Sequence, residues 1–496
     1  MAPEGSTDDD GALALGSPFV HAGKSVELWI TPSSIDIHGE GGDRKRMAWR
    51  DVLGAHAQGA TLTICTCAPD KRGTRRLAAM HMESRVSSDL TKFAQAIQYM
   101  AKMPPAQIPT TLSPIDVMAD NAPKLQRCIV LINPVGGKGH AAHLFESKVS
   151  AIFSAASLAV TKLLTTHAGH ASEVAQALDL AAFDLLVCVG GDGLMSEIIQ
   201  GLMKRKDWQV AIRFPLGIVP AGTGNGLAKS LLASRGESYC VENSAFGIAK
   251  GSPNPLDIAT TQSEDATSYS FLSLAWAFIA DVDLNSEKFR FLGSARFTAA
   301  AVAKMFSFKR WRGRLTYLVD ATAPPPQYWD LHAPDNETKT PALSLVGGAK
   351  NHDADGMWET IHGNFRLFYA SSGSHASWDV HLAPGGHVND GFMHLAVVDG
   401  DASFFSMAQV LLGLEDGSHV ANKHVQIIKT RAYRLEVDDD DFLSLDGERF
   451  AGRHVQVEVH RGLGRIMALP SEMMLAPEGA ITSPRRSFRR PKISFK

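Results

Sequence analysis

Short, continuous apolar runs recur through the middle of the chain, and each is followed by a segment with helical spacing. The clearest runs are Cys128–Asn133, Leu185–Val189 and Leu216–Pro220. A strand that is apolar at nearly every position is typical of a sheet covered on both faces. Strands that alternate with helices favour a parallel sheet with right-handed crossovers. We therefore predict an α/β parallel-sheet lobe over residues 125–255.

After about residue 255 the pattern changes to an alternation of apolar and polar positions, most clearly in Tyr433–Val437 and His454–Val459. Period-two alternation indicates strands with one buried face. We expect a β-sandwich-like second lobe over residues 256–472. The longest apolar stretch, Phe271–Ala280, is shorter than the roughly 20 residues that span a bilayer. Any membrane contact should therefore be peripheral.

A third unit precedes both lobes. Period-two segments such as Val26–Ile30 are followed by a helix with Leu90, Phe93 and Ile97 on one face. The pattern predicts a small β-rich domain closed by a helix over residues 23–104. We expect a disordered segment at 1–22 and a proline-marked linker at 105–124. The unit resembles a pleckstrin-homology domain.

Basic residues form three groups outside the two lobes. Two groups, Arg44–Arg46 and the run that holds Lys71, Arg72, Arg75 and Arg76, fall in predicted loops of the N-terminal domain. The third is the basic tail at 473–496. Such groups can contact the headgroups of anionic lipids, or they can be ordinary solvated charges. Both interpretations stay open.

Composition narrows the functional class. The 496 residues include 49 basic and 52 acidic ones, for a net charge of -3. The chain therefore has no overall positive potential that would favour the binding of nucleic acid. The five cysteines are too few and odd in number for a disulfide framework, which favours a reducing cytosol. Cys65 and Cys67 are not followed by a second pair of Cys or His residues at the spacing of a metal site. The acidic N-terminus does not match a secretory signal. We expect a cytoplasmic protein that associates reversibly with membranes. A homodimer stays open.

Three glycine-rich loops carry the candidate chemistry, each directly after a predicted strand of the α/β lobe. They are residues 133–139 (NPVGGKG), 190–193 (GGDG) and 220–226 (PAGTGNG). Glycine lets backbone amides approach a polyphosphate closely, and the start of the next helix adds partial positive charge. The first loop does not fit the Walker A pattern, and Leu227 stands where the third would need a glycine to match the dinucleotide fingerprint. A mononucleotide is the better interpretation.

The middle loop places an acid, Asp192, among amides that favour anions. A carboxylate there would repel phosphate unless it holds a cation or accepts a proton from a reacting hydroxyl. Asp192 is therefore the candidate catalytic residue. Glu197, one helical turn later, is placed to face the same crevice through water or magnesium.

The three loops resemble the catalytic domain shared by sphingosine, ceramide and diacylglycerol kinases. The segment from Phe271 to Lys288, continuing to Phe297, is similar to sphingosine kinases in particular, and residues 445–448 (LDGE) resemble the family's last nucleotide-contact motif. The resemblance implies ATP and Mg²⁺ as cofactors and no metal ion held by the protein alone. The residues it assigns to ATP are Asn133, Pro134, Val135, Gly136, Gly137, Thr165, Gly191, Glu197, Gly222, Thr223, Gly224, Arg290, Arg296, Asp446, Gly447 and Glu448. The residues it assigns to the lipid substrate are Gly190, Gly191, Asp192, Gly193 and Asp283.

The choice of lipid also has a physical basis. A sphingoid base carries an ammonium beside its reactive hydroxyl, and a carboxylate at Asp283 would bind it with a charge-assisted hydrogen bond. Ceramide and diacylglycerol lack that charge. We therefore expect an ATP-dependent kinase that phosphorylates the primary hydroxyl of sphingosine, dihydrosphingosine or phytosphingosine. A ceramide or diacylglycerol kinase is the alternative. The alkyl tail should enter an apolar tunnel in the second lobe.

Overall fold

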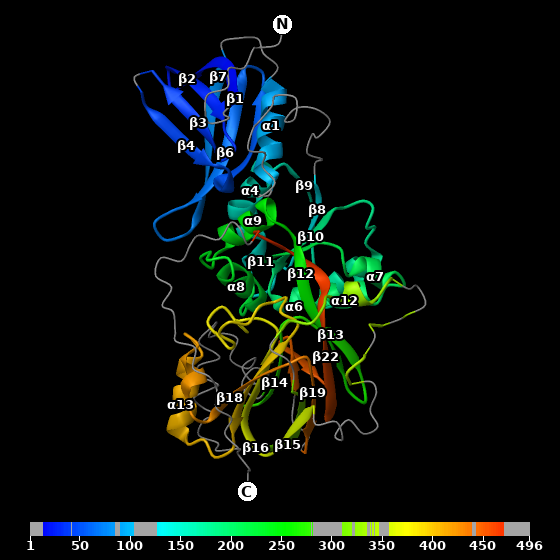
Figure 1. The fold of residues 1–496 in the computed structure, drawn as a ribbon. Helices are drawn as coiled ribbons and strands as arrows, with labels where there is room; N and C mark the ends of the chain where they lie inside the picture. Colours follow the sequence, from blue (N-terminus) through cyan, green and yellow to red (C-terminus); the bar gives the residue numbers. More distant parts are fainter. Residues whose placement is uncertain are drawn as a thin grey trace.

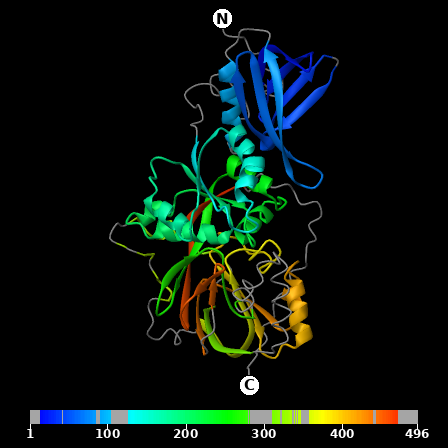
Figure 2. The same cartoon turned by 180° about the vertical axis from the view of Figure 1, so that it is seen from behind.

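The computed structural model describes residues 13–40, 42–84, 90–103, 126–278, 280, 310–319, 323–334, 338, 340–341, 343–346, 357–438 and 443–470. Three parts follow one another along the long axis of the molecule, with the N-terminal sheet at one end, the α/β part in the middle and a strand-rich lobe at the other end (Figure 1). The view from behind shows the same order (Figure 2).

The N-terminal part is an antiparallel sheet of seven strands in the order β4-β3-β2-β1-β7-β6-β5. Helix α1 (Leu90–Lys102) buries Leu90, Phe93 and Ile97 in the same core. One expectation was wrong, because the segment predicted to be disordered contains strand β1, which pairs with β2. The alternation of apolar and polar residues in β1 is interrupted at Gly16, Ser17 and Pro18, where the pairing register of β1 with β2 shifts. The strands are β1 (Leu13–His21), β2 (Lys24–Ile30), β3 (Ser34–Gly39), β4 (Arg44–Ala48), β5 (Val52–Gln58), β6 (Thr61–Pro69) and β7 (Arg75–Ser84).

The middle part contains the predicted parallel sheet, in the order β9-β8-β10-β11. Its strands are β8 (Gln126–Ile132), β9 (Leu158–Leu164), β10 (Leu185–Gly190) and β11 (Leu216–Pro220). The register pairs Ile132 with Val189 and Gly190 with Pro220, so β8, β10 and β11 end at the same level. The loops after these strands therefore lie side by side. The helices are α3 (Ala141–Leu144), α4 (Ser150–Ala155), α5 (His170–Ala177), α6 (Asp192–Met203), α7 (Trp208–Ala211), α8 (Gly226–Ala233) and α9 (Val241–Lys250), and a π-helical turn at Phe145–Val149 joins α3 to α4.

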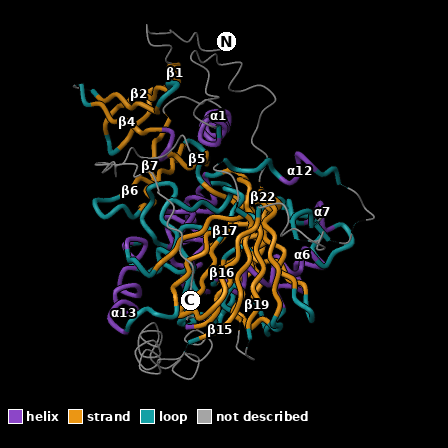
Figure 3. Tube along the Cα trace, turned by 60° about the horizontal axis from the view of Figure 1, so that its bottom comes forward, coloured by secondary structure: helices purple, strands orange, loops and turns teal. Residues whose placement is uncertain are grey.

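A single sheet connects the middle part to the C-terminal lobe. Strand β22 (His454–Ala468) runs parallel to β11 at one end and antiparallel to β12 and β19 along its length. Figure 3 shows β22, β19, β16 and β15 side by side in this lobe. The other elements of the lobe are β12 (Ser252–Gln262), β13 (Thr267–Ser270), β14 (Ser273–Ala277), β15 (Trp311–Leu318), α12 (Tyr328–Leu331), β16 (Trp358–Ser371), β17 (Met393–Asp399), α13 (Phe404–Gly413), β18 (Val425–Thr430), β19 (Ala432–Val437), β20 (Leu443–Leu445) and β21 (Glu448–Phe450).

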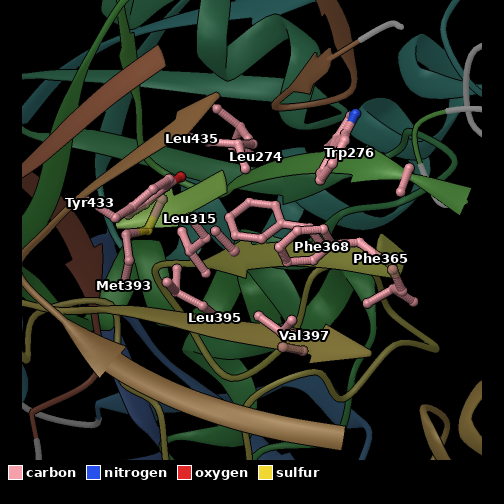
Figure 4. Packing of buried hydrophobic residues seen from close by; sticks show 14 of the residues in the cluster. Leu274, Trp276, Leu315, Phe365, Phe368, Met393, Leu395, Val397, Tyr433 and Leu435 are labelled. Carbon is pink, nitrogen blue, oxygen red and sulfur yellow. The ribbon is translucent and has the colours of Figure 1, made fainter. Parts of the chain in front are cut away.

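The C-terminal lobe encloses its own apolar core. Figure 4 shows part of this core, with Leu315 and Phe368 lying between Tyr433 and Trp276 in that view. In the part of the chain that the structure describes, no helix is long and apolar enough to cross a membrane.

Buried charges join the N-terminal domain to the middle part. Arg75 of β7 is 3 % exposed and donates to Glu237, which follows α8, with a shortest distance of 2.6 Å. Its guanidinium also donates to Asp51 at 2.9 Å and lies 3.8 Å from the centre of the Phe246 ring. Lys250, the last residue of α9, donates to the carbonyls of Trp49 and Val52, each at 2.7 Å. Arg75 thus holds two domains together, and its buried side chain does not face a lipid surface.

Candidate functional site

The first glycine-rich loop is shaped by the side chain of Asn133. Its Oδ1 accepts hydrogen bonds from the amides of Val135 at 3.1 Å and Gly136 at 3.0 Å, an Asx turn that bends the chain directly after β8. Gly137 then adopts a φ of +60°, which disfavours residues with a side chain. The loop leaves the side chain of Val135 exposed.

The three loops touch one another backbone to backbone. A Cβ atom on Gly137 would lie 2.4 Å from the carbonyl oxygen of Ala221, and one on Gly222 would lie 2.3 Å from the Cα of Gly191. The Ala221 amide also donates to the carbonyl of Gly190 at 2.8 Å. Glycine is required at these contacts because no side chain fits between the loops. The structure therefore brings together all three loops that the sequence singled out.

Asp192 lies at the point where the second and third loops meet. It begins α6 and is buried, with an exposed fraction of 8 %. Its Oδ2 accepts from the Gly226 amide at 2.8 Å and its Oδ1 from the Leu227 amide at 3.2 Å, so the carboxylate caps the start of α8. Burial raises the pKa of Asp192 to about 6, although these amide bonds act in the opposite direction. The carboxylate is therefore mostly ionised at neutral pH and within reach of accepting a proton.

Glu197 and Thr165 hold the segment that connects β9 to α5. The Glu197 carboxylate accepts from the Ala171 amide at 3.2 Å, in the first turn of α5. Thr165 is buried, and its amide donates to the carbonyl of Ile132, the last residue of β8, at 2.9 Å. Both residues fix the segment between β9 and α5 beside the first loop.

Asp446 serves the architecture of the site. Its buried carboxylate accepts from the Ser270 hydroxyl at 2.7 Å and from the amides of Leu272 at 3.1 Å and Ser273 at 2.8 Å. The structure shows its carboxylate holding the turn between β13 and β14, and the contact with ATP that the resemblance assigns to this residue stays a prediction. Burial raises the pKa of Asp446 to about 6. Glu448, two residues later, is exposed, and its Oε1 would lie 3.6 Å from a Cβ on Gly193.

One part of the site was missed by sequence reasoning. The segment Ala376–Trp378, which precedes β17, closes over the third loop. The Trp378 amide donates to the Gly224 carbonyl at 2.8 Å, and a Cβ on Gly226 would lie 2.6 Å from the Ala376 carbonyl oxygen. No local pattern marks this segment, because the contact is made between residues about 150 positions apart.

Three predicted site residues, Asp283, Arg290 and Arg296, lie outside the described residues, as does the tail 473–496. Among the residues that are described, no group of three or more His, Cys, Asp or Glu side chains could hold a metal ion.

Comparison with known proteins identifies the family. Residues 127–261 match the diacylglycerol kinase catalytic domain, and residues 277–468 match the YegS C-terminal NAD kinase beta sandwich-like domain. Over 357 residues the chain is 34% identical to sphingosine kinase 1 of Homo sapiens, covering 68% of this chain and 90% of that protein. The chain belongs to the sphingosine kinase family.

Two further relatives agree with this membership. Sphingosine kinase 1 of Arabidopsis thaliana is 31% identical over 66% of this chain and 69% of its own length. Sphingoid long chain base kinase 4 of Schizosaccharomyces pombe is 27% identical over 71% of this chain and 77% of its own. Among solved structures, a putative diacylglycerol kinase from Bacillus anthracis shares the fold, with a TM-score of 0.50 at 18% identity over 71% of this chain and 98% of that one.

Proposed function

We propose that this kinase transfers the γ-phosphate of ATP to the primary hydroxyl of a sphingoid base, with Asp192 as the proton acceptor. The hydroxyl oxygen attacks the γ-phosphorus, the bond from that phosphorus to the β–γ bridging oxygen breaks, and ADP leaves. The hydroxyl proton passes to the Asp192 carboxylate. The observation that carries this proposal is the position of Asp192, buried at the junction of two phosphate-type loops with its charge held by two amides.

The three loops supply the nucleotide site in this proposal. The loop backbone of residues 133–137, Gly191 and 222–224 would surround the phosphates, and Thr165 and Glu197 would hold the segment beside them. Because the Asp446 carboxylate is engaged in the turn 270–273, we place the contact of residues 446–448 at Gly447 and Glu448. Arg290, Arg296 and Asp283 keep the roles that the family resemblance implies.

The residues present also fit a magnesium ion that arrives with ATP. Burial raises the pKa of Asp192 and the charge of Asp446 adds to this effect, so two carboxylates share this region, and Glu448 approaches Gly193 nearby. Mg²⁺ is usually bound through one or two carboxylates together with substrate phosphates. When bound, the ion would neutralise charge on the β- and γ-phosphate oxygens.

The sphingoid base is favoured over ceramide and diacylglycerol by the named relatives, which include sphingosine kinases and sphingoid long chain base kinases. The test is phosphorylation of sphingosine, ceramide and diacylglycerol by wild type and by Asp192→Asn. We expect wild-type turnover with sphingosine alone. The variant should lose a factor of about 10² to 10⁴ in kcat. Wild-type turnover by the variant, or a preference for ceramide, would refute the assignment.

Peripheral membrane contact is the second proposal for this kinase. Its substrate carries a long alkyl chain, and Arg44 and Lys45 present exposed basic side chains on the edge strand β4. Arg46, in contrast, pairs with Asp36 at 2.8 Å. Flotation with vesicles that contain phosphatidylserine tests this contact. Arg44→Glu/Lys45→Glu should weaken the binding, and unchanged binding would exclude this strand as the contact.

A further inference from the structure

Three buried polar atoms have no hydrogen-bond partner within the described residues and belong to side chains around the core of the C-terminal lobe. They are the Tyr433 hydroxyl, the Thr261 hydroxyl and the Trp276 indole N–H. All three residues have an exposed fraction of 0 %. Buried polar side-chain atoms nearly always have a partner, and leaving one unpaired destabilises a protein. An unpaired polar atom of this kind beside an apolar core suggests that a polar ligand group pairs with it.

The strand register places two of these hydroxyls in one row. Tyr433 of β19 and Thr261 of β12 both pair with Val457 of the intervening strand β22. Directly paired residues of antiparallel strands lie on the same face of the sheet, so Tyr433, Val457 and Thr261 all face the lobe interior. Tyr433 and Val457 are members of the apolar core.

A neighbouring tyrosine on the same face of the sheet does have a hydrogen-bond partner within the protein. Tyr317 of β15 is paired with Tyr433 on the next strand, and its hydroxyl donates to Glu359 at 2.6 Å. The two tyrosines thus share one face of the sheet, but the Tyr317 hydroxyl is bonded within the protein, whereas the Tyr433 hydroxyl has no partner among the described residues.

The Tyr433 ring points to the side of the lobe core where β14 pairs with β20. Figure 4 shows the Tyr433 ring directed toward the strand that carries Leu274, and Leu274 is paired with Leu445, the residue before Asp446. Burial raises the pKa of both Tyr433 and Asp192, and the charge of Asp446 adds to the effect on each. Leu274 and its partner Leu445 thus connect the core around Tyr433 to the turn that begins at Asp446.

We propose that Tyr433 forms a subsite for a secondary hydroxyl of the sphingoid base. The inference rests on the proposed function, since it concerns the same substrate. The phenol stays neutral in this apolar environment, so it can both donate to and accept from an alcohol. An ammonium would be bound better by a carboxylate. A hydroxyl on C3 or C4 of the base therefore has the complementary chemistry.

The experiment compares Tyr433→Phe with Tyr317→Phe as a matched control. Each variant loses one phenolic oxygen from the same face of the same sheet. The substrates are 2-aminooctadecan-1-ol, which has no secondary hydroxyl, dihydrosphingosine with one on C3, and phytosphingosine with hydroxyls on C3 and C4. The measurements are kcat/KM for each base and the melting temperature without lipid.

We expect Tyr433→Phe to lower kcat/KM by roughly 5- to 20-fold for the bases whose hydroxyl it binds, and to leave 2-aminooctadecan-1-ol unchanged. A loss confined to phytosphingosine assigns the C4 hydroxyl, and a loss for both hydroxylated bases assigns C3. The same variant should raise the melting temperature by about 2 to 4 °C, because an unpaired buried hydroxyl is removed. Tyr317→Phe should lower the melting temperature and leave the preference among bases unaltered.

Two results would overturn the subsite. In one, Tyr433→Phe changes kcat/KM by the same factor for all three bases, which indicates an effect on packing alone. In the other, it changes none of them, which indicates that the hydroxyl is unpaired in the complex or bonded to water. A wild-type enzyme that phosphorylates none of the three bases would instead refute the proposed function.

Discussion

Replacing Arg75 by alanine should separate the N-terminal domain from the catalytic part. The guanidinium makes three contacts with the Glu237 carboxylate, of 2.6 to 3.1 Å, one with Asp51 at 2.9 Å and one with the Cys67 carbonyl at 2.8 Å. Arg75→Ala removes all of them at once. It leaves Glu237, whose side chain is 3 % exposed, as a buried charge without its arginine.

The expected cost follows from this burial. Breaking a buried ion pair by removing one partner costs about 3 to 5 kcal/mol, because the remaining charge is desolvated without compensation. A domain is stable by roughly 5 to 15 kcal/mol in total, so this loss is a large share. The double variant Arg75→Met/Glu237→Met should recover most of it, since replacing both charges by apolar side chains of similar volume is often close to neutral.

Urea denaturation followed by tryptophan fluorescence measures the change. Trp49 is a suitable reporter because it is buried in the N-terminal domain and its carbonyl accepts from Lys250 across the interface. Arg76→Ala is the control: this neighbouring arginine pairs with Asp70 at 3.0 Å, but the two side chains are 63% and 31% exposed. An exposed pair of this kind contributes about 0 to 1 kcal/mol.

The comparison between the two alanine variants decides the question. If Arg75→Ala and Arg76→Ala reduce the free energy of unfolding by the same small amount, the N-terminal domain is not held as the structure shows. A separate, earlier unfolding transition of the N-terminal domain in Arg75→Ala would support the interface directly. Loss of this domain interface in Arg75→Ala does not require any change in the structure of the glycine-rich loops.

Three other predictions concern the site and the interface. Because burial raises the pKa of Asp192 to about 6, kcat should fall as the pH drops through 6, whereas an ordinary aspartate would stay ionised to about pH 4; a flat profile from pH 7 to 5 would contradict its role as base. Gly222→Ala would place a Cβ 2.3 Å from the Gly191 Cα, so kcat/KM for ATP should fall by about 100-fold, while Gly247→Ala, with nothing within 4 Å of its Cβ, should retain activity in the same assay. Burial lowers the pKa of Lys250 to about 7, so between pH 7 and about 10 the unfolded chain binds one more proton than the folded one. The free energy of unfolding of the wild type, relative to that of Lys250→Met, should therefore rise with pH over this window. A difference that stays constant would exclude the shift.

Sequence alone placed the three loops, because each depends on neighbours in the chain. An apolar run, a glycine-rich turn and a helical pattern follow one another within about 20 residues at 128–145, 185–200 and 216–233. Parallel strands that end at one edge must bring such loops together, so the convergence of Gly137, Gly191 and Gly222 was predictable. The candidate role of Asp192 in the middle loop was likewise predictable, because its neighbours in the chain are the glycines of that loop.

The partners of buried charges were decided only by the tertiary structure. Asp192 and Asp446 are both acids beside glycine, yet one caps α8 through amides more than 30 residues away and the other holds a turn more than 170 residues away. Arg75 and Arg76 are adjacent and chemically identical, but one is buried in a domain interface and the other is exposed. The reason is physical: local pattern fixes which strands and loops form, whereas long-range register and docking decide what each charge meets and how much water remains around it.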